Sequence, residues 1–117
     1  MKISKNFSRE EFKCKCCDFA TVDVELLKLL ETIREHFNSP VNITSGCRCR
    51  LHNTAVGGSF NSKHMEGIAA DIVVTGIQPK DVYDFVDAHA PNKYGIGSYK
   101  SFTHVDVRNK KARWTSK

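Results

Sequence analysis

The stretch Ser62-Lys-His-Met-Glu-Gly-Ile-Ala-Ala-Asp71, followed directly by Ile72-Val-Val74, is the part of the sequence around which the rest is organised. It places an imidazole, His64, and a carboxylate, Asp71, seven residues apart. A glycine and two alanines between them leave room for the chain to turn and for the two side chains to converge. The apolar, β-branched run predicts a buried strand over 69–74. The stretch therefore predicts that His64 lies in a turn and Asp71 in the strand that follows it, close enough for their side chains to meet.

A second imidazole lies further along, in Phe102-Thr-His104-Val-Asp106-Val107, which also has the pattern of a strand. His64, Asp71 and His104 would supply two nitrogens and one oxygen. Three such ligands leave one position of a zinc ion open for water, as in catalytic zinc sites. The alternative is that His64 is an ordinary loop histidine, Asp71 a turn or cap residue and His104 a sheet histidine, with no metal. The spacing alone does not decide between a zinc site and this alternative.

The remaining pattern predicts a single α+β domain over 1–117, with a largely antiparallel sheet of about four strands and flanking helices. Leu26, Leu30 and Ile33 fall on one face of a helix that begins at Asp23 and ends near Phe37. The other predicted elements are a helix over 79–90 and strands over 41–44, 69–74, 95–99, 103–107 and 112–115. We expect the last two strands to form a hairpin.

Charge and hydropathy favour neither nucleic acid nor membrane as a partner. The net charge is +5, but the basic residues are scattered and no aromatic-interleaved basic motif occurs. A basic nucleic-acid-binding domain with a cysteine-bound structural zinc therefore remains a weaker alternative. The longest apolar runs are only a few residues, so no membrane insertion is expected. The N-terminal residues lack the apolar segment of a secretory leader.

Five cysteines form two clusters, Cys14, Cys16 and Cys17 in one and Cys47 and Cys49 in the other. An odd number without a visible leader argues against a full disulfide framework. Cys14, Cys16, Cys47 and Cys49 could hold a second, structural zinc, although their spacing is not the usual Cys-x-x-Cys. Disulfides between the clusters and free buried thiols are the alternatives.

Several linked motifs, in a fixed order, give the chain a family resemblance. They are Ser45-Gly-Cys-Arg48, Asn53 to Gly58, Ser62-x-His64-x-x-Gly67-x-Ala69-x-Asp71, Gly95-Ile-Gly-x-Tyr99 and Phe102-x-His104-x-Asp106. With them the sequence resembles the M15 group of zinc D-alanyl-D-alanine peptidases, and within it short phage and bacterial cell-wall peptidases. The resemblance implies a Hedgehog/DD-peptidase fold, with His64, Asp71 and His104 as zinc ligands.

The resemblance also implies substrate-binding roles. Arg48 would hold the free carboxylate or another anionic group of the peptide, since a guanidinium can grip a carboxylate with two hydrogen bonds. Ser62 would bind substrate or brace His64. Tyr99 and Phe102 would line the cleft, with ordinary core packing as the alternative.

The general base is not evident. Relatives commonly carry Glu, Asp or His three residues before the last zinc histidine, where this chain has Ser101. Asp106 lies two residues after His104, so on a strand the two side chains share one face. Asp106 could act as the base, orient His104 or pair with Arg108, and the sequence leaves these roles open.

The sequence therefore predicts a zinc metallopeptidase that hydrolyses peptidoglycan stem peptides, as a D-Ala-D-Ala carboxypeptidase or an endolysin-type endopeptidase. A zinc-containing module of the same fold that binds peptide without cleaving it is the alternative. We expect a monomer made in the cytoplasm that reaches the cell wall after release, during phage lysis or as part of a virion.

Overall fold

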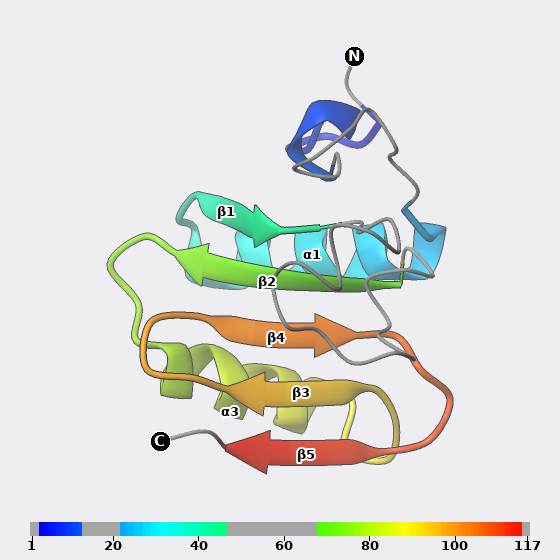
Figure 1. The fold of residues 1–117 in the computed structure, drawn as a ribbon. Helices are drawn as coiled ribbons and strands as arrows, with labels where there is room; N and C mark the ends of the chain where they lie inside the picture. The colour runs from blue at the N-terminus through cyan, green and yellow to red at the C-terminus, as the bar shows by residue number, and fades with distance from the viewer. Residues whose placement is uncertain (1–2, 13–21, 47–67, 116–117) are drawn as a thin grey trace, which may run out of the picture.

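The computed structural model describes residues 3–12, 22–46 and 68–115 of the 117-residue chain. In chain order the elements are the 3-10 helix η1 (Arg9–Phe12), α1 (Val24–Phe37), β1 (Val41–Ser45), β2 (Ala69–Val74), α3 (Pro79–His89), β3 (Gly95–Ser98), β4 (Thr103–Asp106) and β5 (Ala112–Thr115) (Figure 1). None of the helices in these ranges is long and apolar enough to cross a membrane.

The strands form one mixed sheet in the order β1-β2-β4-β3-β5 (Figure 1). The α+β class is confirmed, but the sheet has five strands rather than about four. β1–β2, β2–β4 and β4–β3 pair antiparallel, whereas β5 runs parallel to β3. The predicted hairpin between the last two strands is therefore wrong. β4 is already paired with β2 on one side and β3 on the other, so β5 cannot pair with it and instead adds to the outer edge of β3.

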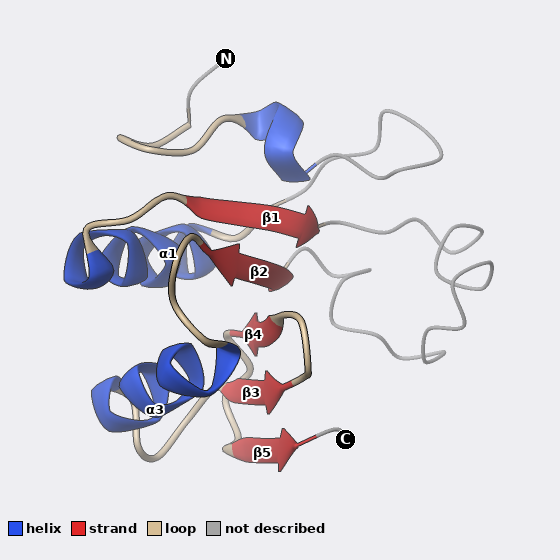
Figure 2. Ribbon diagram, turned by 90° about the vertical axis from the view of Figure 1, so that its left-hand side faces the viewer, coloured by secondary structure: helices blue, strands red, loops and turns tan. Residues whose placement is uncertain are grey.

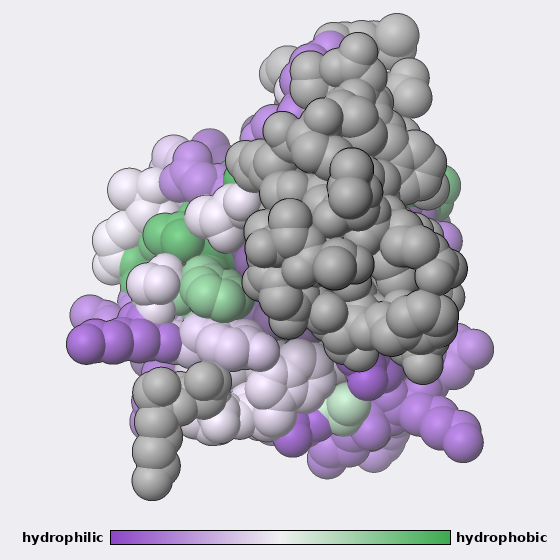
Figure 3. Space-filling model, viewed as in Figure 1, coloured by the Kyte–Doolittle hydropathy of each residue, from purple (hydrophilic) through white to green (hydrophobic). Residues whose placement is uncertain are grey.

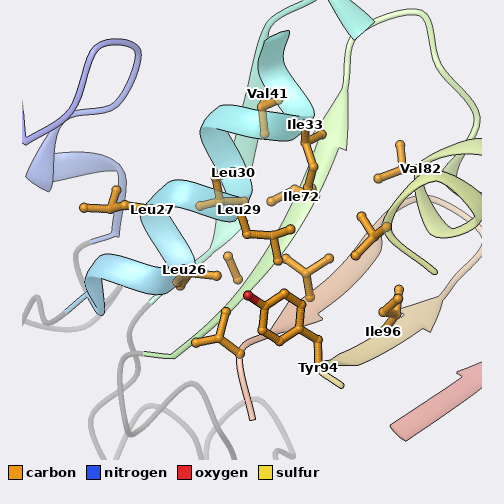
Figure 4. Close-up of a cluster of buried hydrophobic side chains, with 14 of the residues drawn as sticks. Leu26, Leu27, Leu29, Leu30, Ile33, Val41, Ile72, Val82, Tyr94 and Ile96 are labelled. Carbon is orange, nitrogen blue, oxygen red and sulfur yellow. The ribbon is translucent and has the colours of Figure 1, made fainter. Parts of the chain in front are cut away.

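The helices α1 and α3 cover the same face of the sheet (Figure 2). α1 begins after Asp23, whose carboxylate accepts a hydrogen bond from the Glu25 N–H, and ends at Asn38 in the left-handed conformation. Its buried leucines and Ile33 pack with Ile72, Ile96 and other apolar residues in one core (Figure 4). The helix predicted from the spacing of Leu26, Leu30 and Ile33 is confirmed.

Alternation along the strands divides the side chains between two faces of the sheet. Ala70 and Ile72 of β2 and Val105 of β4 belong to the core beneath the helices. Asp71 and His104 point to the opposite face, because successive side chains of a strand alternate. No helix of the described residues packs against that face, and in this sense it is called the helix-free face below. This face therefore carries the polar groups, and the core on the other side holds their strands in place.

Candidate functional site

One row of residues crosses the helix-free face from strand to strand. Asp71 of β2 lies opposite His104 of β4, His104 lies opposite Gly97 of β3, and Gly97 lies opposite Trp114 of β5. Asp106 occupies the next position of β4 on this face, opposite Gly95. The sheet register thus brings together groups that are up to 43 residues apart in the sequence, between Asp71 and Trp114.

His104 lies between two carboxylates. Its Nδ1 is 2.9 Å from Asp71 Oδ1, and its Nε2 is 2.8 Å from Asp106 Oδ2. The side chains of His104 and Asp71 are only 11% and 10% exposed, so both contacts are shielded from solvent. Burial alone would lower the pKa of His104, but the hydrogen bonds with Asp106 and Asp71 outweigh it and raise the pKa.

Asp106 is fully buried, and both of its carboxylate oxygens are engaged. Oδ1 accepts hydrogen bonds from the Gly95 N–H, the Arg108 N–H and Arg108 Nε, at 3.1, 3.2 and 2.7 Å. Oδ2 accepts from Arg108 Nη2 at 2.7 Å as well as from His104. Burial would raise the pKa of Asp106, but the bonds from His104 and Arg108 prevail and hold it well below its usual range.

These contacts fix which nitrogen of His104 carries a proton. An ionised Asp106 can only accept hydrogen bonds, so Nε2 of His104 must be the donor. In the neutral ring Nδ1 would then be an acceptor facing Asp71 Oδ1, which is an acceptor too. Two acceptors 2.9 Å apart need a cation between them. That cation is either a proton, which fits the raised pKa of His104, or a metal ion.

Half-buried aromatic side chains lie beside this row. The Trp114 indole N–H donates a hydrogen bond to the Tyr99 hydroxyl at 2.9 Å, and Tyr99 stacks on Phe102 with ring centroids 4.4 Å apart. Pale surface of intermediate hydropathy lies over the C-terminal part of β3 and β5 on the helix-free face (Figure 3). Tyr99 and Phe102 are thus joined to the row by the contact between Tyr99 and Trp114.

The sequence pattern of the family described as Peptidase M15 matches residues 5–106, which is most of the chain. The chain belongs to the peptidase M15 family. It is therefore a peptidase, and its substrate is a peptide. No curated protein matches the sequence. In this M15 peptidase Arg108 and the whole of β5 lie beyond the matched range.

The structure brings four of the predicted site residues of this M15 peptidase to one face, namely Asp71, Tyr99, His104 and Asp106. His64, Arg48, Ser62 and the cysteines Cys14, Cys16, Cys47 and Cys49 lie outside the described residues. Their roles, and the cysteine site, stay predictions. Within the described ranges no three His, Cys, Asp or Glu side chains form a group that could hold a metal.

The part of the predicted zinc site that is described fits a metal ion. Zinc bonds to nitrogen and oxygen are about 2.0–2.2 Å long, so atoms 2.9 Å apart, as His104 Nδ1 and Asp71 Oδ1 are, can both reach one ion. Metal-bound histidines usually donate their other ring N–H to a carboxylate, as His104 does to Asp106. The third donor would be His64.

Sequence reasoning missed Trp114 and gave Arg108 only a possible pairing with Asp106. The parallel pairing that places Trp114 beside His104 has no local signal. One signal was present in the sequence, because two glycines separated by one residue in a strand, Gly95 and Gly97, often mark a close approach of other groups.

Proposed function

We propose that this M15 peptidase is a zinc metallopeptidase that cleaves peptide bonds in peptidoglycan stem peptides, with the fold of the D-Ala-D-Ala peptidases and the Hedgehog domain. The observation that carries the proposal is the position of His104 Nδ1 and Asp71 Oδ1, which face each other 2.9 Å apart, shielded from solvent. Both atoms are of the kinds that bind zinc, and one divalent cation would bind both at once.

His64, Asp71 and His104 would hold the zinc ion. When bound, zinc would polarise the scissile carbonyl and lower the pKa of a coordinated water to about 7. The chain's own contribution is to keep Asp71 and His104 in place before the metal arrives. Cross-strand pairing of β2 with β4 fixes their backbones, and Asp106 fixes the ring of His104.

Asp106 acts as a positioning residue in this proposal rather than as the general base. Its carboxylate accepts the His104 Nε2–H and several hydrogen bonds from Arg108, and none of its surface is exposed. Taking a proton from water would require it to give up these bonds, and its lowered pKa makes it a weak base. Its role is to hold the His104 tautomer in which Nδ1 could bind a metal.

The substrate would be an anionic peptide of the cell wall. The net charge of +5 favours such a polymer, and Arg48 would bind its carboxylate. Tyr99 and Phe102, stacked beside the row, would form one wall of the cleft. We propose a monomer that is made in the cytoplasm and acts on the wall after release, in phage lysis or from a virion.

Hydrolysis of purified peptidoglycan, with and without a chelator, tests the proposed function. We expect products that disappear on chelation and return with zinc, and mass spectrometry of the muropeptides would identify the bond that is cut. Asp71→Asn should abolish turnover, whereas the matched change Asp84→Asn, at an exposed position of α3, should leave it unchanged. Equal activity of both variants would contradict the proposal.

A zinc-binding module without hydrolytic activity is the second candidate. The exposed Ser101 stands where relatives carry an acid or base, and the hydrogen bonds of Asp106 are all within the protein. Bound zinc with no chelator-sensitive product would favour this candidate. Metal analysis of reduced protein also tests the cysteines, because a second equivalent of zinc would support a site at Cys14, Cys16, Cys47 and Cys49.

The positioning role of Asp106 predicts a specific effect on metal affinity. Asp106→Asn keeps the size of the side chain but places an N–H₂ group where Arg108 and His104 now donate. We expect zinc binding to weaken about 10–100-fold, the usual effect of losing such a partner. Competition with a chromophoric chelator measures it. Unchanged affinity together with lost turnover would instead favour Asp106 as the base.

A further inference from the structure

Two glycines of β3, Gly95 and Gly97, leave an open strip on the helix-free face between β4 and β5. A Cβ at Gly97 would overlap the indole of Trp114, and a Cβ at Gly95 would overlap the carboxylate of Asp106 and the Arg108 guanidinium. The space that these side chains occupy thus exists because β3 carries no side chain there. Trp114 is therefore able to lie across β3 and reach β4.

The indole of Trp114 contacts two members of the site. Its ring centroid is 5.2 Å from that of His104, and the Arg108 guanidinium lies 5.5 Å from it, within cation–π range. Arg108 in turn holds Asp106, and Asp106 holds His104. His104, Asp106, Arg108 and Trp114 therefore form a closed cycle of contacts. We call these four residues the His104 cluster.

The contacts with Asp71 and Asp106 orient the imidazole of His104 through its two nitrogens. The χ2 torsion of histidine is broad and roughly two-fold, so packing against the ring restricts its rotation further. The indole, tilted at 45° to the imidazole, provides such packing. The Trp114 N–H is itself held by the Tyr99 hydroxyl, which limits movement of the indole.

We propose that Trp114 is a positioning residue of the peptidase site, which locks the imidazole of His104 in the orientation that presents Nδ1 to Asp71 and holds Arg108 against Asp106. The expected effect on zinc affinity rests on the proposed function. The expected effect on the orientation of His104 does not, because it applies to the metal-free protein as well. It extends the site beyond the range matched by the family, because Trp114 lies in β5.

Two readouts on the same variants test this. The first is the NMR signals of the His104 imidazole in metal-free protein. The second is zinc affinity, measured by competition with a chelator. In Trp114→Ala we expect multiple or averaged His104 signals and about tenfold weaker zinc binding. Trp114→Phe, which keeps an aromatic face, should retain a single set of signals. Gly97→Ala should act like Trp114→Ala, because it crowds the indole without removing it.

Arg113→Lys provides the matched control. Arg113 precedes Trp114 in β5, but its side chain bonds to α3 and the loop that follows it, so the change should weaken the attachment of β5 without altering contacts to His104. We expect a single set of His104 signals and wild-type zinc affinity in this variant.

The two proposals fail in different ways. Wild-type protein that binds no zinc would contradict the proposed function, while the His104 signals would still decide the role of Trp114. Wild-type signals and affinity in both Trp114→Ala and Gly97→Ala would overturn the positioning role. An equal disturbance of His104 in Arg113→Lys would overturn it too, because loosening of β5 would then explain the effect.

Discussion

At the scale of single residues, the buried polar groups of this protein are matched to partners that fix their protonation. Asp106 stays ionised because Arg108 and His104 donate to it, and this in turn sets the donor side of His104. The described residues contain no buried side-chain nitrogen or oxygen without a hydrogen-bond partner. Unpaired buried charges would be costly, so removing either partner is expected to disturb the other.

Tyr94 offers a second residue-scale test, away from the site. It is 7% exposed and its hydroxyl donates to Glu25 at 2.7 Å; burial and this bond raise its pKa from 10.0 to about 12. The neutral phenol therefore contributes stability that is fully present below pH 10 and is lost as the pH rises toward 12. Above pH 10, wild-type protein should lose up to about 1.4 kcal/mol per pH unit more than Tyr94→Phe.

Urea unfolding of both proteins between pH 9 and about pH 11 measures this difference. Tyrosinate absorbance provides the control, because Tyr94→Phe should lack the ionisation step that the raised pKa of Tyr94 places at about 12 in the wild type. Parallel stability curves for the two proteins would contradict the raised pKa.

At the scale of elements, Arg113 fastens the edge strand β5 to the end of α3. Its Nε donates to Asp87 of α3 at 2.7 Å, and its Nη2 donates to the carbonyls of Ala90 and Lys93 at 2.7 and 3.0 Å. Its Nη1 donates to the Tyr94 carbonyl at 2.6 Å. Carbonyls at a helix C-terminus lack partners within the helix, so one guanidinium here satisfies several groups.

The change Arg113→Lys should destabilise the protein by about 2–3 kcal/mol, because an ammonium keeps the charge but cannot span the same set of acceptors. Denaturant unfolding measures it, with Lys110→Arg as an exposed control. A loss below about 0.5 kcal/mol, the range of ordinary surface changes, would show that β5 is held in another way.

At the scale of the whole molecule, the N-terminal segment is part of the domain. Phe7 and Phe12 are each 1% exposed and belong to the main core, and η1 packs against the end of β1, where Gly46 leaves no room for a side chain. The carboxylate of Glu31 in α1 accepts hydrogen bonds from Ser4 Oγ and from the backbone and side chain of Asn6. α1 thus holds the segment at Ser4 and Asn6, and the core holds it at Phe7 and Phe12.

Glu31→Ala should release this segment. We expect amide hydrogen exchange over 3–12 to accelerate and stability to fall by about 1–3 kcal/mol, since charged hydrogen bonds are lost. Glu35→Ala, an exposed position one turn further along α1, is the matched control and should change neither. Unaltered exchange in Glu31→Ala would mean that Phe7 and Phe12 alone hold the segment.

The sequence by itself determined the local elements and the family of this protein. The apolar spacing of α1 and the β-branched run of β2 are local signals, and linked motifs from Ser45 to Asp106 identified an M15 peptidase. Alternation along β4 was enough to predict that His104 and Asp106 share a face.

Only the tertiary structure decided the partner of β5, the buried state of Asp106 and the place of Trp114. A strand pairs with whichever edge the other strands leave free, and that edge is not encoded near the strand itself. The protonation of a carboxylate depends likewise on burial and on donors brought from other strands. Likewise, the sequence around Gly97 does not show that the space beside this glycine is filled by Trp114, 17 residues further along the chain.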